Sequence, residues 1–441
     1  MERLIEKELL HWKEQKTHMP LIVRGARQIG KSYVIEKFGK EYFEHLAVVN
    51  FEFSPQLKSV FSSLDPDKLV ATLELSLGIL IKPGNTLLFL DEIQECPEAI
   101  MSLRYFKEKM PQLHVIAAGS LLEFALNSEQ FRMPVGRVQY LYMKPLSFKE
   151  FLLAIGQPQL KIFIEEVTWQ TEIPGVIHEQ LLEYIRLYSF LGGMPAVVQD
   201  YLDNRSLLSA RRIQSAILAT YRGDFGKYAN VAKHKYLELL FGKAPELVAQ
   251  QFRYVNVARE IQSRDLKDAL EKLCLAGLIF QVLSTNATGL PLKSLIHESR
   301  FKLLFLDLGL VSSAVQQDAQ LMLDNQLLWV NRGALAEQFV GQELLANQDF
   351  YMETALYYWS RDARGSTAEI DYIVQVGAQI IPVEVKAGST GRMKSLQMFM
   401  AEHNSPLGIR ISTLPLSCEK HIASIPFYLV SELNRLGSWP K

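Results

Sequence analysis

Cysteine is scarce in this sequence, and its scarcity excludes two kinds of protein. The three cysteines, Cys96, Cys274 and Cys418, lie far apart among 441 residues and form no Cys-x-x-Cys pair. An odd number of widely separated cysteines argues against a disulfide framework and against a structural zinc site. The same pattern favours a reducing compartment, so we expect neither disulfides nor structural zinc.

An excess of charge of one sign and long apolar segments are also missing. Forty-seven basic residues face 48 acidic ones, and the net charge of -1 removes the global basic excess that marks many nucleic-acid binders. The first 15 residues are charged where a signal peptide is apolar, and no uncharged apolar run reaches the roughly 18 residues of a membrane span. The sequence therefore predicts a soluble, cytoplasmic protein with no membrane contact.

The composition that is present is that of a folding chain. Hydrophobic residues make up 48% and charged residues 22% of the sequence, which is ordinary for globular proteins. At roughly 150 residues per domain, this length suggests about three domains. A single small binding module is thereby excluded.

The first 150 residues alternate short apolar runs with helical patterns, which is typical of a parallel sheet covered on both faces. We expect five strands, at 21–23, 47–51, 86–90, 115–118 and 138–141. Residues 147–263 then show helical periodicity, interrupted by the turn signal Gly192-Gly193. The fold class is therefore α/β, with an all-helical middle part.

Later segments predict a small hairpin and a further α/β unit. A helix at 263–273 precedes apolar runs at 278–283 and 302–307, an order similar to that of a winged helix-turn-helix. From residue 333 the pattern becomes helix, strands and hairpin. We expect four modules, namely a core at 1–150, a helical lid at 151–230, a winged helix at 231–320 and an α/β domain at 321–441.

A phosphate-binding loop is the most specific motif. The pattern GxxxxGK[ST] follows the first apolar strand and opens a helix, the context that this motif requires. Its backbone N–H groups and the helix N-terminus face bound phosphates, Lys31 is expected to reach the β- and γ-phosphates, and Ser32 to bind Mg²⁺. The residues expected to bind the nucleotide are Gly25, Ala26, Arg27, Gln28, Ile29, Gly30, Lys31 and Ser32.

The strand at 86–90 ends in two acids, the Walker B arrangement. Because the strand is apolar, it delivers Asp91 to the carboxyl edge of the sheet, where ligands of α/β folds bind. We expect Asp91 to act as a second metal ligand beside Ser32. Glu92 is then placed to activate the attacking water as a general base.

Two further residues are candidates with open alternatives. Ser120 follows the strand at 115–118 and is expected near the γ-phosphate as a sensor, although with Glu123 it equally fits a helix capping box. Arg137 precedes the strand at 138–141, where a finger arginine projects toward the nucleotide of a neighbouring subunit. An ordinary surface arginine is the alternative for Arg137.

These motifs together resemble the AAA+ ATPases of a predicted-ATPase family that carries a C-terminal domain of unknown function. Besides the loop and the Walker B acids, the resemblance rests on Gly136-Arg137, on residues 144–151 and on the turn at 192–195. It implies a core sheet of order 5-1-4-3-2, a helical lid, a winged helix, and a C-terminal domain like the restriction endonucleases. A lid sensor arginine is implied too, for which Arg212 and Arg222 are candidates.

A second constellation lies near the C-terminus. Residues 369–386 read as a hairpin turning at Gly377-Ala378; if Val376 pairs with Gln379, Asp371 faces Glu384 and Glu369 faces Lys386. The spacing resembles the PD-(D/E)XK nuclease core, in which two carboxylates bind Mg²⁺ and the lysine orients water. The candidate metal ligands are Asp371, Glu384 and Glu337, with Lys386 as the catalytic lysine. Cross-strand salt bridges are the alternative.

These observations favour an enzyme that binds ATP and Mg²⁺, hydrolyses ATP, and is coupled to DNA binding or processing. Residues 211–243 carry seven basic side chains against two acidic ones, a local excess of five that suits DNA and also suits a solvated helix face. A finger arginine acting between subunits requires a homo-oligomer. The competing hypothesis is a nucleotide-dependent switch or scaffold that recruits a partner without hydrolysis.

Overall fold

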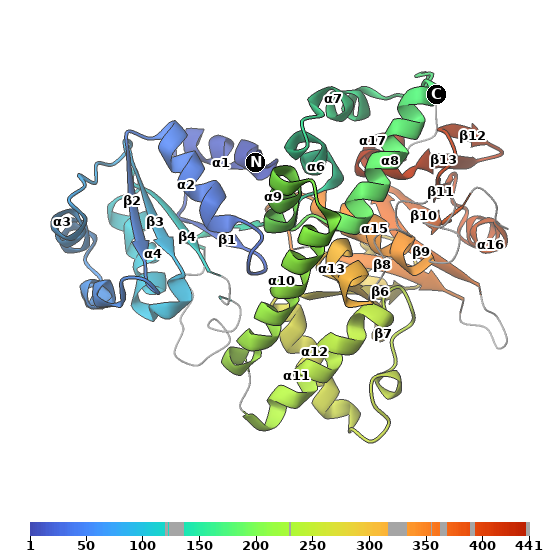
Figure 1. Cartoon of the computed structure of the whole chain (residues 1–441). Coiled ribbons are helices and arrows are strands. Elements are labelled where there is room, and N and C mark those ends of the chain that lie inside the picture. Colours follow the sequence, from blue (N-terminus) through green and yellow to red (C-terminus); the bar gives the residue numbers. More distant parts are fainter. Residues whose placement is uncertain are drawn as a thin grey trace.

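Two β-sheets organise the chain, and a group of helices lies between them (Figure 1). The computed structural model describes residues 1–119, 122, 136–228, 231–315, 333–353, 355–361, 368–388 and 393–437. Ser120 therefore lies outside the described residues. Along these stretches, every helix is too short or too polar to span a bilayer.

The first sheet is parallel throughout and confirms the five expected strands. Its order is β2-β3-β4-β1-β5, which is the order that the family resemblance implies, read from the other edge. The strands are β1 (Leu21–Arg24), β2 (His45–Asn50), β3 (Thr86–Asp91), β4 (His114–Ala118) and β5 (Gln139–Tyr142).

Helices cover both faces of this sheet because β3 and its neighbours are apolar on both sides. Leu87 and Phe89 pack toward α1 (Ile5–Glu14) and α2 (Lys31–Tyr42), while Leu88 and Leu90 pack toward α3 (Pro66–Leu77) and α4 (Pro97–Lys109). The alternation follows the period of two in a strand. Short 3-10 turns at Pro55–Ser62 and Ile93–Glu95 complete this lobe.

The middle of the chain is helical, as the periodicity predicts. Its helices are α6 (Phe148–Ala154), α7 (Pro158–Glu166), α8 (Gly175–Leu191), α9 (Pro195–Asn204), α10 (Leu207–Tyr228), α11 (Val231–Lys243) and α12 (Ser263–Leu275), with 3-10 turns at Ala244–Glu246 and Tyr254–Asn256. The turn between α8 and α9 needs its glycines. Gly192 has a φ of 72°, and a Cβ at Gly193 would lie 2.2 Å from the Leu146 carbonyl oxygen.

The second sheet has eight strands in the order β12-β13-β11-β10-β9-β8-β6-β7. These are β6 (Ile279–Thr285), β7 (Ile296–Phe305), β8 (Leu356–Ser360), β9 (Glu369–Val376), β10 (Gln379–Val385), β11 (Gly408–Ser412), β12 (Ser417–Glu419) and β13 (Ile422–Pro426). The accompanying helices are α13 (Leu308–Ala314), α15 (Gly333–Ala346), α16 (Lys394–His403) and α17 (Leu433–Leu436), with 3-10 turns at Leu292–Leu295 and Phe427–Glu432.

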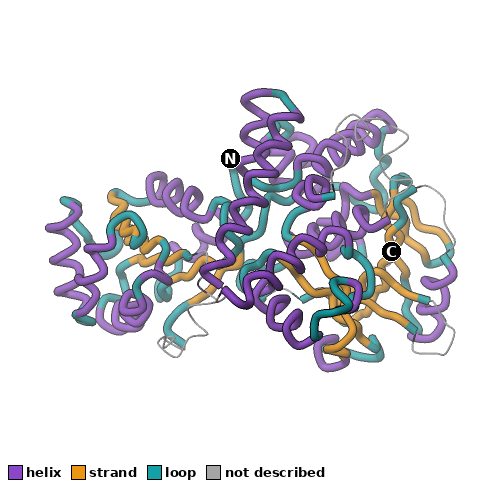
Figure 2. The backbone as a smooth tube through the Cα atoms, turned by 60° about the horizontal axis from the view of Figure 1, so that its bottom comes forward, coloured by secondary structure: helices purple, strands orange, loops and turns teal. Residues whose placement is uncertain are grey.

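The expected small hairpin, β6–β7, is an extension of this second sheet. Strand β6 pairs in parallel with β8, so the sheet runs across the predicted module boundary at 320/321. Figure 2 shows these strands gathered at one end of the molecule. The predicted β9–β10 register is confirmed from Val376 opposite Gln379 to Tyr372 opposite Val383.

Asp307 joins the helical part to the second sheet. Its carboxylate, which is fully buried, accepts hydrogen bonds from Gly193 N–H at 2.6 Å and from Leu310 N–H at 3.0 Å, and it caps α13. Gln342 of α15 donates to the same carboxylate at 3.4 Å. One hydrophobic cluster accordingly runs from the first sheet through the helices to the second sheet.

Candidate nucleotide-binding site

The loop between β1 and α2 has the backbone of a phosphate cradle. Gly25, Gln28 and Gly30 all have positive φ, at 144°, 65° and 92°. A Cβ at Gly25 would lie 2.4 Å from the carbonyl oxygen of Met143, the residue that follows β5. The close packing of the loop against this residue therefore requires glycine at position 25. Successive turns of this kind aim N–H groups at one point, at which α2 also begins.

Lys31 lies inside this loop. Its side chain is 7% exposed, and its Nζ donates to the carbonyl oxygens of Gly25 and Ala26, both at 2.8 Å. Burial lowers the pKa of Lys31 to about 8, although the nearby carboxylates of Glu92 and Asp91 oppose the shift. The ammonium is therefore held by the loop in the region where phosphates are cradled in such motifs.

Asp91 gathers three donors at the carboxyl edge of the first sheet. Its Oδ1 accepts from the Ser32 hydroxyl at 3.1 Å and from Glu92 N–H at 3.1 Å, and its Oδ2 accepts from the Asn50 amide at 3.0 Å. Burial, followed by the charge of Glu92, raises the pKa of Asp91 above its ordinary value. The pairing of Ser32 with Asp91 brings the two expected metal ligands together.

This pair suits a magnesium ion. Mg²⁺ prefers hard oxygen ligands and usually takes only one or two from protein side chains, with phosphates and water supplying the others. A hydroxyl beside a carboxylate at the mouth of the loop is such a set. The magnesium assignment of Ser32 and Asp91 stays a prediction that the local chemistry suits.

Glu92 is held by a side chain that sequence reasoning missed. Glu92 adopts a left-handed backbone with φ of 50°, and its Oε2 accepts from the amide of Gln94 at 2.6 Å. The side-chain oxygen Oε1 of Gln94 lies against Gly119, where a Cβ would come within 2.2 Å of it. Gln94 thus links the expected general base to the end of β4, next to the expected sensor position.

Asn50 was also missed, but a signal for it existed. It ends β2, and in the observed register it stands opposite Asp91 on β3. Because parallel strands end at the same edge, a polar residue closing the strand beside the Walker B strand is a predictable partner. Asn50 also holds the following turn, as its Oδ1 accepts from the N–H groups of Glu52 and Phe53.

Helix α10 clamps the loop from the outside. The Arg27 guanidinium pairs with the carboxylate of Asp224 at 2.6 and 2.7 Å, and Tyr221 donates to the Arg27 carbonyl oxygen at 2.8 Å. Arg222, a lid sensor candidate, places its guanidinium 5.6 Å from the ring of Phe241. The sensor role of Arg222, or of the exposed Arg212, stays a prediction.

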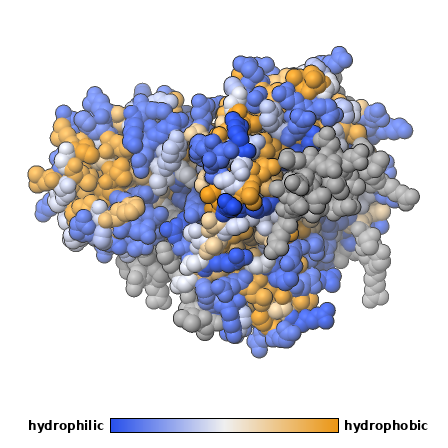
Figure 3. Space-filling view, viewed as in Figure 1, coloured by the Kyte–Doolittle hydropathy of each residue, from blue (hydrophilic) through white to orange (hydrophobic). Residues whose placement is uncertain are grey.

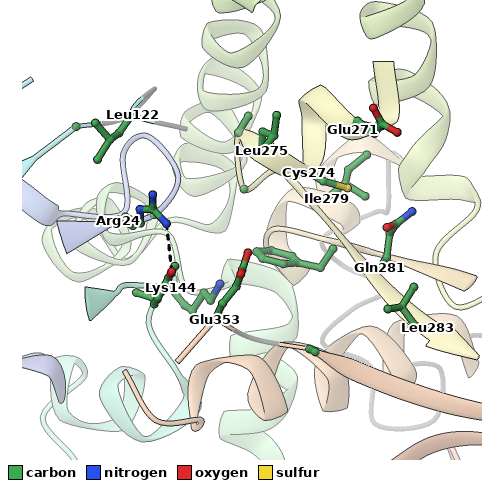
Figure 4. A pocket seen from close by; sticks show the side chains of 17 residues that line it. Arg24, Leu122, Lys144, Glu271, Cys274, Leu275, Ile279, Gln281, Leu283 and Glu353 are labelled. Carbon is green, nitrogen blue, oxygen red and sulfur yellow. Dashed lines mark hydrogen bonds between the residues drawn. The ribbon is translucent and has the colours of Figure 1, made fainter. Parts of the chain in front are cut away.

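Two cavities flank the loop. One of 600 Å³ is lined by α2, by the start of α9 and by α10, including Gly30, Tyr33 and Pro195. The other, of 530 Å³, lies between the carboxyl edge of the first sheet and β6 (Figure 4). In the second cavity, Lys144 places its Nζ 4.4 Å from the ring of Phe280, and burial lowers the Lys144 pKa to about 8.

Arg137 is exposed and forms an ion pair with a residue of α4, which packs on the first sheet. Its Nε lies 3.2 Å from the Glu108 carboxylate, and the pKa of Glu108 is lowered by its hydrogen bonds with Arg104 and Arg137. An exposed position suits a contact with a neighbouring subunit. Its role as a finger stays a prediction.

Three acids of the C-terminal constellation come together around a lysine that sequence reasoning missed. Lys302 of β7 contacts Glu337 of α15 together with Glu369 and Asp371 of β9. Lys386 instead pairs with Glu384 at 2.5 Å. Throughout the described ranges, no group of three or more His, Cys, Asp or Glu side chains is placed to hold a metal ion. The metal assignment of Glu337, Asp371 and Glu384 stays a prediction.

Family models match three parts of the chain. Residues 17–152 match an AAA domain, residues 182–321 a domain of unknown function (DUF8612), and residues 332–426 another domain of unknown function (DUF4143). The first match spans the parallel sheet, the phosphate-binding loop and the Walker B acids. Over residues 17–152 the chain is therefore similar to an AAA domain, as the motifs indicated.

The solved structures that resemble this chain share little sequence identity with it. A Walker-type ATPase of Pyrococcus abyssi is 16% identical, covers 71% of this chain and 95% of its own, and has a TM-score of 0.45. Orc1 of Aeropyrum pernix, solved with DNA, is 13% identical, covering 72% and 93%, with a TM-score of 0.31. RuvB of Thermotoga maritima is 14% identical, covering 63% and 88%, with a TM-score of 0.30. No curated protein matches the sequence.

Proposed function

We propose that this chain is an ATP hydrolase of the AAA+ type that uses Mg²⁺. The observation that carries the proposal is the meeting of Lys31, Ser32, Asp91 and Glu92 at the carboxyl edge of the sheet, within an AAA domain. Each of these side chains has the chemistry that phosphoryl transfer from a nucleotide requires.

Different groups of the chain bind the phosphates, accept the proton and hold the metal ion. The backbone N–H groups of residues 25–32 bind the phosphates, and the Lys31 ammonium turns from the loop carbonyls toward them, which adds charge-assisted hydrogen bonds. Glu92 accepts the proton of the attacking water once Gln94 releases its carboxylate. Bound Mg²⁺, held by Ser32 and Asp91, supplies neutralising charge.

The cavity of 600 Å³ beside the loop is where we place the nucleoside. It borders Gly30 at the start of α2, and Val34, Pro195 and Ile217 give it apolar walls suited to a planar base. Gln28, Gln199 and Thr220 add polar groups that can recognise ring nitrogens. Because α9 and α10 form one wall, binding of the base would couple the nucleotide to the helical part.

Replacing Glu92 by Gln separates binding from hydrolysis. We expect Glu92→Gln to bind ATP as the wild type does and to hydrolyse it about 100-fold more slowly or worse, because the amide accepts no proton. Phosphate release and binding of a fluorescent ATP analogue measure the two properties, and Glu95→Gln, an exposed acid three residues on, is the matched control. Equal turnover by wild type and Glu92→Gln would remove Glu92 from the mechanism.

A non-hydrolysing switch is the second candidate, and one contact favours it. The Gln94 amide donates a hydrogen bond to the Glu92 carboxylate at 2.6 Å. In this arrangement the oxygen that would accept a proton from water already has a partner. In such a switch, ATP would alter the clamp between Arg27 and Asp224 and so the position of α10. ATP-dependent recruitment of a partner, unchanged in Glu92→Gln and without phosphate release, would favour the switch over the hydrolase.

We also propose DNA as a partner, through the exposed part of the basic stretch. Lys233 and Lys243 are engaged with Asp268 and Glu246, whereas the side chains of Arg212, Arg222 and Lys235 are exposed. A surface of this kind binds phosphates by releasing counterions. The furthest extension of this proposal is that the C-terminal part processes DNA as a nuclease-like domain.

Salt is the test of the DNA proposal. Affinity for duplex DNA is expected to fall steeply with salt, and neutralising Arg212, Arg222 and Lys235 to Gln should lower both the affinity and the salt slope, by about one unit of slope for each phosphate that the variant no longer neutralises. Neutralising Lys16, Lys40 and Lys68, which are exposed on the first lobe, changes the net charge equally and serves as the control. DNA affinity that is independent of salt would contradict the proposal.

A homo-oligomer completes the proposal. Arg137 is exposed at the edge of the first lobe, where it can reach a neighbouring nucleotide. Apolar side chains also gather on that lobe in the view of Figure 3, and Leu75 of α3 is 87% exposed. Both features suit contacts between copies of the AAA domain.

A further inference from the structure

Lys302 stands at the centre of the acidic cluster in the second sheet. Its Nζ lies 2.6 Å from Glu369 Oε1, 3.1 Å from Glu337 Oε2 and 3.5 Å from Asp371 Oδ1, and its side chain is 3% exposed. The lysine comes from β7, whereas the acids come from α15 and β9. One ammonium thus connects the hairpin β6–β7 to two other elements.

The ammonium matches this cluster better than a divalent metal does. An ammonium has three donors, and three carboxylate oxygens surround it at distances suited to hydrogen bonds and close ion pairs. Mg²⁺ would need oxygen atoms at about 2.0–2.1 Å in an octahedral shell, at the point that Nζ fills. A metal ion at this point, between Glu337, Glu369 and Asp371, therefore does not fit while Lys302 occupies it.

Glu384, the remaining expected metal ligand, pairs with Lys386. The residue is 7% exposed, and while its Oε1 pairs with Lys386, its Oε2 is buried and has no hydrogen-bond partner in the described part of the chain. Asp371, whose charge acts on Glu384, uses its second oxygen to accept from Val385 N–H at 2.8 Å. A buried carboxylate oxygen without a partner costs free energy, and Lys302 does not offset this cost from its observed position. Glu384 is therefore not one of the acids that Lys302 neutralises by direct contact.

We propose that Lys302 is the resident cation of this cluster and that it excludes divalent metal from Glu337 and Asp371. The lysine also ties the hairpin β6–β7 to α15 and β9. A metal ion cannot occupy this point while Lys302 is in place. This goes beyond the proposed ATP hydrolysis and does not depend on it.

Binding of Mn²⁺ to the full chain without nucleotide tests the proposal, with bound ions counted by electron paramagnetic resonance. The wild type is expected to show no site that depends on Asp371, whereas Lys302→Met should gain one site, about 10-fold or more tighter than any wild-type binding, since three carboxylates lose their cation. The gain should vanish in Lys302→Met/Asp371→Asn. Lys302→Arg, which keeps the charge, should gain nothing.

Removal of a buried cation can also unfold the chain, and the same experiment covers that case. If Lys302→Met lacks native far-UV circular dichroism, Mn²⁺ is expected to restore it, and to fail in Lys302→Met/Asp371→Asn. Mn²⁺ binding to the wild type that Asp371→Asn removes would overturn the proposal. So would a Lys302→Met chain that neither binds Mn²⁺ nor is restored by it.

Discussion

Lys31→Ala is expected to weaken ATP binding by about 100-fold or more while leaving the fold intact. Charge-assisted hydrogen bonds contribute about 1.5–3 kcal/mol each, and the Lys31 ammonium is placed to make them with phosphates. Titration with a fluorescent ATP analogue measures the loss.

The control for this experiment lies on the same helix. Lys40→Ala removes an equal charge from an exposed position of α2, where Lys40 pairs with Glu36 one turn away, and it should bind ATP as the wild type does. Similar affinities for Lys31→Ala and the wild type would show that the loop between β1 and α2 does not bind the phosphates.

Asp307→Ala is expected to destabilise the chain by about 3 kcal/mol or more, the largest effect on stability that we foresee. The substitution leaves the buried N–H groups of Gly193 and Leu310 without their acceptor, and each such loss costs about 1–3 kcal/mol. Urea unfolding near pH 6 measures the change. Asp203→Ala, an exposed aspartate on α9, should be nearly neutral, and a comparable loss there would count against this reason.

The same carboxyl predicts a pH dependence. Burial raises the pKa of Asp307 to about 6, from an ordinary value of 3.8. The folded state therefore binds this proton more tightly than the unfolded state, so the wild type loses stability as the pH rises from about 4 through 6, by about 2–3 kcal/mol. Asp307→Asn lacks this titration. In urea unfolding between pH 4 and pH 6, the free energy of unfolding of the wild type should therefore fall relative to that of Asp307→Asn as the pH rises. Parallel profiles would contradict the assignment.

Sequence reasoning succeeded where chemistry is tied to strand ends. Five apolar runs gave the strands of the first sheet, and the loop and Asp91 fell at its carboxyl edge because parallel strands share one edge. The β9–β10 hairpin was equally predictable, since Gly377-Ala378 fixes its register. In each case, residues close in sequence decide the geometry.

The residues that were missed come from elements far apart along the chain. Asp224 clamps Arg27 from almost two hundred positions away, and Lys302 reaches acids on another helix and strand. Neither carries a local pattern, since a lysine in a strand and an aspartate in a helix are both common. Only the packing of the helical part between two sheets brings them to their partners. The extension of the second sheet through β6 and β7 was missed for the same reason.

The central claim is hydrolysis of ATP at the edge of the first sheet. Phosphate release by the wild type, with and without Mg²⁺ and with no nucleic acid, single-stranded DNA or duplex DNA, tests it most directly, with the oligomeric state followed by light scattering. We expect phosphate release that requires Mg²⁺. Tight ATP binding without turnover under all of these conditions would contradict the claim and leave the nucleotide switch.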